Sequence, residues 1–390
     1  MEAEKQINSE KALKNECGPV IICNRETCVT YYQFKKRGKS MKKFLSLSLA
    51  LLMAASVLAG CGDNGASSGA AAGGSSASSG ASSSAAAPTT GGMPGGTSLT
   101  FTTGGDQGTY YGFGGVLAQK VGETTSTTVT AITSGGSQAN IEALEAGDAQ
   151  LGFVQTDVGA YGYEGTRLFE ETGAVDNFST VANLYMEQVQ IVTLDPNIKT
   201  VDDLKGKNVS VGAAGSGVYY NAVDVLNAYG LDVEKDINPT YQSFGDSTES
   251  LQDGKIDAAF VVAGAPTTAV TSLAATKSVY LVSLDDAHID QLLASSPYYS
   301  KNVISKDAYG TPEDVTTVAV GAVVIARDDV SEADVYNFLY GVFENLDDIT
   351  AAHAKGAELS LEFAASYGAV PYHPGAVKYF AEKGIEVPAK

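Results

Sequence analysis

Two glycine-rich stretches contain the residues best suited to bind a small anion. They are Gly104 to Tyr111 (GGDQGTYY) and Gly212 to Tyr220 (GAAGSGVYY). Each follows a short apolar run and precedes a helical pattern, which predicts a strand, a tight turn and the start of a helix. Backbone N–H groups at the start of a helix lack partners within the helix and attract negative charge. We expect the two turns to form facing walls of one ligand cleft.

Other kinds of chemistry lack the residues that they require. The first stretch resembles a dinucleotide-binding turn, but the next expected strand ends without the acid that would hold a ribose. The second stretch lacks the lysine of a phosphate-binding loop. No Gly-x-Ser-x-Gly nucleophile turn occurs in residues 98–390, and no cysteine follows Cys61. The three histidines, His288, His353 and His373, lie far apart. We therefore predict that the chain is not an enzyme and uses no metal and no cofactor.

The charge distribution argues against polyanionic partners. The formal net charge is −20, and 40 of the 45 acidic residues but only 15 of the 25 basic residues lie from Cys61 onward. Such a body repels nucleic acid and anionic lipid. Beyond Cys61 the only arginines are Arg167 and Arg327, so a guanidinium clamp on a ligand carboxylate could come only from these two.

Residues 41–60 have the three regions of a secretory signal peptide. A basic start at Met41–Lys43 is followed by an apolar run, Phe44–Leu58, and by a lipobox that ends at Cys61. The apolar run is too short to be a permanent membrane span. The pattern resembles bacterial lipoproteins, in which cleavage leaves the cysteine as a lipidated first residue. An ordinary signal peptide with a chance cysteine is the alternative.

The lipobox predicts where the protein works. A signal peptide stands at a natural N-terminus, so we expect residues 1–40, which are polar and unpatterned, to derive from an upstream start codon. Residues 61–97 comprise Cys61 and a Gly/Ala/Ser-rich segment, which predicts a flexible tether. We expect an extracytoplasmic body, anchored by lipid at the bacterial cell surface or in the periplasm.

From residue 98 onward, strand patterns alternate with helix patterns, which predicts an α/β fold with parallel sheets covered by helices. The expected strands are 99–102, 129–132, 151–154, 183–194, 209–211, 257–262, 279–284 and 317–325. The expected helices are 110–121, 134–146, 201–207, 220–229, 248–252, 267–275, 332–346 and 350–365. Strands 183–194 and 317–325 have the length to cross between two domains. Ligands of such sheets bind beyond the carboxyl ends of the strands.

A set of short motifs, in a fixed order, resembles the TAXI proteins, the solute receptors of one class of TRAP transporters. The motifs are GTYY at 108–111, GSQAN at 136–140, QTD at 155–157, LKGK at 204–207, GAAGSG at 212–217, GKIDA at 254–258, VAGAP at 262–266, PYY at 297–299 and PYHPGA at 371–376. The resemblance covers the whole of residues 98–390.

The resemblance implies a two-lobed periplasmic-binding-protein fold of the second type, with two doubly wound sheets and a ligand cleft between the lobes. Lobe 1 would comprise residues 98–186 and 286–390, and lobe 2 residues 187–285. It further implies a receptor that closes on a small carboxylate or amino acid, such as glutamate or 2-oxoglutarate, and delivers it to an ion-gradient-driven TRAP permease. We expect a monomer.

The motifs also imply a set of ligand-binding residues. These are Thr109, Tyr110, Ser137, Asn140, Gln155, Asp157, Glu187, Gly215, Ser216, Gly217, Val218, Gly264 and Pro266. The sequence departs from the family at Gln150, Met186 and Val218, where the family usually has Asp, Pro, and Thr or Ser. Glu187 could bind a ligand ammonium, which would favour an amino acid, or could be a structural acid at the hinge; both hypotheses stay open.

Two other functions fit a tethered α/β body. A receptor for an ABC-type permease would share the fold, although the motif set argues against it. A surface or adhesion lipoprotein without a transport role would show neither stabilisation by a ligand nor closure of the lobes.

Overall fold

The computed structural model describes residues 20–24, 27–31 and 91–390, in two compact units with a boundary between Ser82 and Ser83. In the first unit, β1 (Val20–Asn24) pairs antiparallel with β2 (Thr27–Tyr31), in a stretch where the sequence predicted no element. The predicted signal peptide, Cys61 and most of the tether lie outside the described residues. Within the described residues, no helix is long and apolar enough to cross a membrane.

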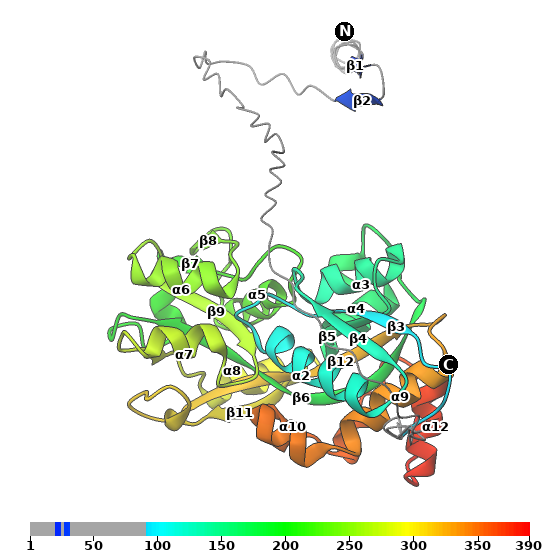
Figure 1. Cartoon of the computed structure of the whole chain (residues 1–390). Coiled ribbons are helices and arrows are strands. Elements are labelled where there is room, and N and C mark those ends of the chain that lie inside the picture. Colours follow the sequence, from blue (N-terminus) through cyan, green and yellow to red (C-terminus); the bar gives the residue numbers. More distant parts are fainter. Residues whose placement is uncertain (1–19, 25–26, 32–90) are drawn as a thin grey trace, which may run out of the picture. The chain divides into compact units, whose positions relative to one another are not determined.

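The second unit is built on one ten-stranded sheet (Figure 1). The strand order is β4-β3-β5-β12-β6-β9-β7-β8, with β10 paired to β6 and β11 to β12. The strands are β3 (Ser98–Thr102), β4 (Thr128–Ile132), β5 (Leu151–Gln155), β6 (Phe178–Thr193), β7 (Asn208–Ser210), β8 (Asn238–Thr240), β9 (Ala258–Ala263), β10 (Tyr280–Leu281), β11 (Ser300–Ile304) and β12 (Val315–Arg327).

This single sheet corrects the expectation of two separate sheets. Strands β6 and β12 have 16 and 13 residues and run antiparallel to each other from Phe178↔Arg327 to Gln188↔Ala319. At one end β12 also pairs with β5, and at the other end β6 pairs with β9, so hydrogen bonding continues from one half to the other. Parallel pairing, as predicted, occurs within each half, where β3 contacts β4 and β5, and β7 contacts β8 and β9.

Helices cover both halves of the sheet (Figure 1). They are α2 (Thr109–Thr124), α3 (Ser137–Ala146), α4 (Thr156–Glu164), α5 (Val218–Ala228), α6 (Phe244–Gln252), α7 (Thr268–Ala274), α8 (Asp286–Ser295), α9 (Glu332–Phe343), α10 (Leu346–Ala352), α11 (Leu361–Ala364) and α12 (Pro374–Glu382). Short 3-10 helices are η2 (Arg167–Phe169), η3 (Val201–Leu204), η4 (Lys306–Ala308) and η5 (Ala354–Glu358).

The helix expected at 350–365 is divided into three pieces. His353 ends α10 in an extended conformation, and its ring Nδ1 accepts the Lys355 N–H at 3.1 Å, which starts η5. Ser360 is also extended, and its hydroxyl caps α11 by accepting the Phe363 N–H at 3.2 Å. Side-chain caps of this kind compete with continued helix and explain why the apolar pattern alone gave the wrong element.

Each half has its own hydrophobic core. The first half comprises β3–β5, α2–α4 and α9–α12, and its core includes Phe101, Phe153 and Phe338. The second half comprises β7–β9 and α5–α8, with Phe260 at its centre. Five residues of the stretch expected at the start of the second part of lobe 1 belong to the core of the second half, namely Ile289, Leu292, Tyr299, Val318 and Val320.

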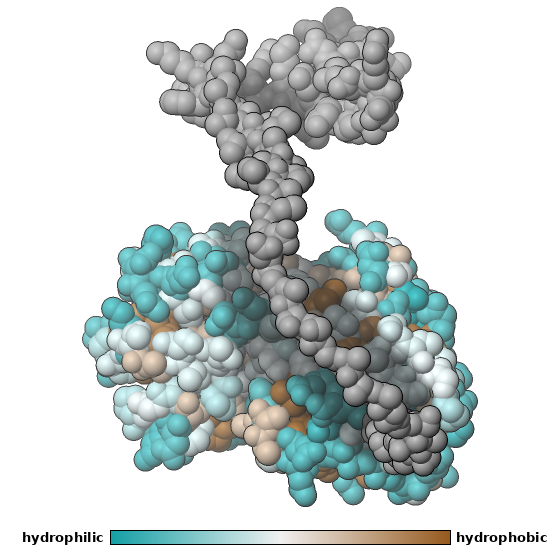
Figure 2. Space-filling view, in the orientation of Figure 1, coloured by the Kyte–Doolittle hydropathy of each residue, from teal (hydrophilic) through white to brown (hydrophobic). Residues whose placement is uncertain are grey.

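The surface agrees with the acidic composition. The face drawn in Figure 2 is mostly hydrophilic, with scattered apolar spots. The large apolar side chains that are exposed, among the described residues, are spread over separate parts of the chain: Tyr111, Ile132, Tyr241, Leu293 and Val303.

Candidate ligand-binding cavity

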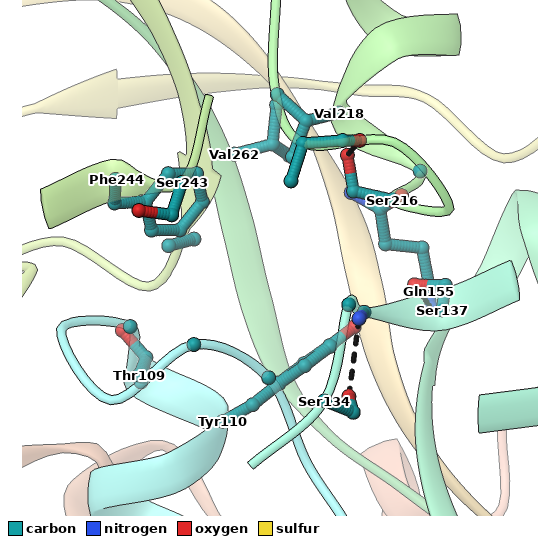
Figure 3. A pocket seen from close by; sticks show the side chains of 18 of the residues that line it. Thr109, Tyr110, Ser134, Ser137, Gln155, Ser216, Val218, Ser243, Phe244 and Val262 are labelled. Carbon is teal, nitrogen blue, oxygen red and sulfur yellow. Dashed lines mark hydrogen bonds between the residues drawn. The ribbon is translucent and has the colours of Figure 1, made fainter. Parts of the chain in front are cut away.

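A cavity of about 80 Å³ lies between the two halves (Figure 3). The first half lines it with Gly104, Gly105, Gly108, Thr109, Tyr110, Ser134, Gly135, Gly136, Ser137 and Gln155, and β6 adds Glu187. The second half contributes Ala213, Ser216, Gly217, Val218, Gln242, Ser243, Phe244, Val262 and Ala263. Both glycine-rich stretches therefore line one cavity, as the sequence predicted.

Four helices begin at this cavity. The N-cap residues of α2, α3, α5 and α6 are Gly108, Gly136, Gly217 and Ser243, and all four are lining residues. The three glycines offer no side-chain cap, so the first turns of α2, α3 and α5 keep N–H donors for another partner. Gly136 has a φ of 109°, which residues with a side chain rarely adopt, so this turn requires glycine. Together the helix ends favour an anionic group in the cavity.

Glu187 adds a buried carboxyl group to the cavity lining, with a charge opposite in sign to that of the helix N-termini. Its side chain is 2% exposed, and Oε2 accepts the Tyr110 hydroxyl at 2.7 Å. Burial raises the pKa of Glu187 to about 8, although the Tyr110 hydrogen bond and the Lys355 charge both lower that pKa. The Tyr110 ring stacks on Phe153, with ring centroids 4.6 Å apart, which fixes the hydroxyl against the carboxyl group.

Lys355 does not neutralise Glu187 directly. Its buried ammonium lies 2.5 Å from Glu358 Oε1 and 5.7 Å from the centre of the Tyr185 ring. Of the described lining residues, Glu187 is the one carboxylate, and none is Lys, Arg or His. The cavity therefore offers one buried acid, several neutral acceptors and free backbone donors.

The raised pKa of Glu187 predicts how stability depends on pH. The unfolded chain has a glutamate pKa near 4.5 and the folded protein about 8, so the folded state binds this proton more tightly. The stabilising contribution is fully present below pH 4.5 and is lost as the pH rises through 8. Between pH 5 and pH 9 the ligand-free protein should lose about 3 to 5 kcal/mol of unfolding free energy through this group. We expect Glu187→Gln to abolish that loss. Urea unfolding at both pH values measures this; an unchanged pH profile contradicts it.

The predicted site residues fall into two groups. Those that line the cavity are Thr109, Tyr110, Ser137, Gln155, Glu187, Ser216, Gly217 and Val218. Those that the structure does not bring to the cavity lining are Asn140, Asp157, Gly215, Gly264 and Pro266.

Three of the residues outside the lining hold the turns from behind: Asn140, Gly215 and Gly264. Asn140 Nδ2 donates to the carbonyls of Thr103 and Phe153, at 2.7 and 2.6 Å, and so joins the first turn to β5. The Gly264 carbonyl accepts the Thr109 hydroxyl at 2.9 Å, and the Gly215 carbonyl accepts the Ala139 N–H at 3.2 Å. These carbonyls connect the two halves. Pro266 follows Gly264 in a loop, after a cis peptide bond.

Sequence reasoning missed several lining residues in the second half, chiefly Gln242, Ser243 and Phe244. Helix α6 begins at Phe244, four residues before the predicted start. The Ser243 hydroxyl accepts the Asp246 N–H at 3.1 Å, and a serine followed three residues later by an acid could have revealed this helix start.

Neither arginine reaches the cavity. Arg327 Nε lies 2.6 Å from Asp329 Oδ1, within the first half. Arg167 Nη2 lies 2.6 Å from Asp224 Oδ1 on α5, so this ion pair joins the halves. A guanidinium clamp on a ligand, which the sequence left possible, is absent from the described lining.

A buried polar network also joins the halves behind the cavity. Asn221 of α5 accepts the Gln155 amide N–H at 2.9 Å through Oδ1. Its Nδ2 donates to Asp157 Oδ2 at 2.9 Å and to the Tyr299 hydroxyl at 2.8 Å. Burial raises the pKa of Asp157 to about 6. Asp157, predicted to touch the ligand, thus holds the residue that orients Gln155.

Arg167 should contribute modestly to ligand affinity. It is the one described non-glycine residue with a positive φ, 54°, and its guanidinium faces the rings of Tyr161 and Tyr220 at 5.4 and 5.8 Å. Because its side chain is 38% exposed, the ion pair is worth little in water. We expect Arg167→Ala to weaken ligand binding about two- to tenfold by calorimetry. Arg327→Ala is the control, since its partner lies in the same half; an equal effect of both variants contradicts a role across the halves.

Residues 101–384 match the model of the NMT1-like family. Among solved structures, MatC from Rhodopseudomonas palustris with bound malate is 16% identical, covering 67% of this chain and 90% of that chain, with a TM-score of 0.47. The periplasmic aliphatic sulphonate binding protein SsuA from Escherichia coli is 17% identical, covering 74% and 91%, with a TM-score of 0.40. The GluR0 ligand-binding core from Nostoc punctiforme with L-glutamate is 16% identical, covering 67% and 99%, with a TM-score of 0.40.

Proposed function

Because the chain belongs to the NMT1-like family of TAXI-type substrate-binding proteins, which bind solutes and are not enzymes, we propose that it is the receptor of a TRAP transporter. It captures a small carboxylate or amino acid outside the cytoplasmic membrane and delivers it to an ion-gradient-driven permease. A lipid on Cys61 and the Gly/Ala/Ser-rich tether would keep the receptor near that permease.

One observation carries this proposal: helix N-termini from both halves meet at a single small cavity. Helices α2 and α3 begin there from the first half, and α5 and α6 from the second. A ligand carboxylate bridging these ends would favour the closed arrangement of the halves, because its contacts come from both. The binding residues we propose are the predicted ones that line the cavity, with Ser134, Gln242, Ser243 and Phe244 added.

The same geometry supports a two-lobed mechanism of the second type. The halves have separate cores, and among the described strands β6 and β12 are the two that contribute residues to both. We propose that bending of these two strands opens the cavity to solvent. Closure then forms the Thr109–Gly264 and Ala139–Gly215 hydrogen bonds across it.

A thermal-shift screen tests the proposal. The protein is first unfolded and refolded to release any retained ligand, then mixed with C4–C6 dicarboxylates, 2-oxoacids and amino acids. We expect one compound class to stabilise it, by about 2.7 kcal/mol at a 100-fold excess over Kd. If no compound raises the melting temperature, the receptor proposal fails and the adhesion hypothesis gains support.

A further inference from the structure

We propose that the ligand is a compact α-amino acid without net charge. Its carboxylate binds the helix N-termini, its ammonium group binds Glu187, and its side chain packs against Val218, Phe244 and Val262. This inference rests on the proposed function of the cavity as the solute site, and it narrows the solute to one charge class.

The charges around the cavity decide between a zwitterion and a dicarboxylate. The described lining residues include one carboxylate, Glu187, and no basic side chain. Arg167 and Arg327 are paired with aspartates elsewhere, and Lys355 is paired with Glu358. A second ligand carboxylate would therefore meet no cation and would approach Glu187. In a weakly polar cavity a carboxylate without a cation partner is costly, and beside Glu187 it also requires that Glu187 keep its proton.

The hydrogen-bond acceptors fit an ammonium group. Tyr110 donates to Glu187 Oε2, and none of the described residues donates to Oε1. The cavity-lining amides of Gln155 and Gln242 each have a buried Oε1 that accepts no hydrogen bond from the described residues. An ammonium group brings three donors and no acceptor, which suits a cavity with unpaired acceptor oxygens. Gln155 is only 2% exposed, so leaving its oxygen unpaired is unfavourable.

The size and the wall of the cavity limit the ligand side chain. About 80 Å³ would hold roughly six water molecules at 10–15 Å³ each. Figure 3 shows Phe244, Val262 and Val218 across the cavity from Tyr110, so the second half presents an apolar wall. A side chain of one to four carbons, with or without a hydroxyl, fits this wall. Long or charged side chains do not.

The pH dependence of binding distinguishes the two charge classes. The groups whose charges act on Glu187 are Asp157 of α4 and Lys355 of η5, and Tyr110 of α2 holds it by the hydrogen bond. Glu187 keeps its proton in the buried empty site and must lose it to pair with an ammonium group. Amino-acid affinity should therefore rise up to tenfold per pH unit between pH 6 and 8, with proton release. A dicarboxylate would bind the protonated form, so its affinity would stay nearly constant between pH 6 and 7 and fall only above about pH 8.

The experiment is titration calorimetry of the refolded protein with L-alanine, L-serine, L-threonine and L-valine, and with succinate, L-malate, 2-oxoglutarate and L-glutamate. Titrations in phosphate and in Tris count the protons released. We expect a neutral amino acid to bind most tightly and to release a proton at pH 7. Glu187→Gln should weaken it at least tenfold and abolish the pH dependence, whereas Glu145→Gln, an exposed acid on α3, should change neither.

Each contrary result has a separate meaning. Binding of a dicarboxylate or 2-oxoacid in preference to every neutral amino acid overturns this inference and leaves the receptor function standing. Amino-acid binding that Glu187→Gln does not weaken overturns the assignment of the ammonium group. If none of the compounds binds, both the inference and the proposed function fail.

Discussion

A single methyl group at position 217 is expected to abolish tight ligand binding while leaving the protein folded. Gly217 has φ −68° and ψ −20°, a conformation open to any residue, so alanine introduces no backbone strain. Its Cβ, however, would lie 1.6 Å from Gln155 Oε1 and 2.8 Å from Val158 Cγ2, both on the other half. Moving Gln155 aside would break its 2.9 Å hydrogen bond to Asn221. The halves can therefore meet only if this position has no side chain.

We expect Gly217→Ala to weaken ligand binding at least a hundredfold, or about 2.7 kcal/mol, as measured by calorimetry. Without ligand, its free energy of unfolding in urea should stay within about 0.5 kcal/mol of that of the unchanged protein, because the clash exists only in the closed form. Gly122→Ala on α2 is the matched control, since its Cβ meets no atom within 4 Å. Full affinity in Gly217→Ala would show that closure does not require this contact.

The elements that the sequence predicted well are those whose signals are local. The glycine stretches at 104–111 and 212–220 each contain an apolar strand end and a helix start within a dozen residues, and both elements were found. The sequence predicted the buried strand β5 equally well, because its first four residues form an apolar run and Gln155 ends it. Local patterns of this kind do not depend on which distant segments pack against them.

The features that the sequence did not predict depend on distant partners. Strand β12 pairs with both β5 and β6, and no property of residues 315–327 alone reveals that two sheets become one. Helix α8 was missing from the expected helices, and its buried residues Ile289 and Leu292 belong to a core to which α5 also contributes. The tertiary contact decided the element, not the pattern.

The candidate site shows the same division. Motifs at turns gave Thr109, Ser137 and Gly217, which line the cavity through their own backbone position. They also suggested Asp157, which instead supports Asn221 behind the cavity, because the QTD motif fixes where the residue lies in the chain but not which way it faces. Asn221 itself, in the middle of an amphipathic helix, gave no signal, although it connects Gln155 to Asp157.

A substitution of Asn221 is the strongest test of the hydrogen-bond network that joins the two halves. Asn221→Asp keeps the size of the side chain and replaces the Nδ2 donor by an oxygen facing Asp157 Oδ2, where the present distance is 2.9 Å. Asn221 and Asp157 are both fully buried, so two ionised carboxylates there would repel strongly and one must bind a proton. Burial already raises the pKa of Asp157 to about 6, and a second carboxylate raises the pKa of the pair further. The pair should therefore hold a proton at pH 5, whereas at pH 8 binding or losing that proton destabilises the folded state.

We expect Asn221→Asp to lose about 3 to 5 kcal/mol of stability, or to open the halves and lose ligand affinity, at pH 8. At pH 5 the shared proton replaces one hydrogen bond, and the loss should shrink to about 1 kcal/mol. Asn227→Asp, an equal charge change at an exposed position of α5, should show neither effect. Urea unfolding and ligand titration at the two pH values measure both quantities. If the loss were the same at pH 5 and pH 8, Asn221 would act by shape alone, and the hydrogen bonds between the halves would not determine closure.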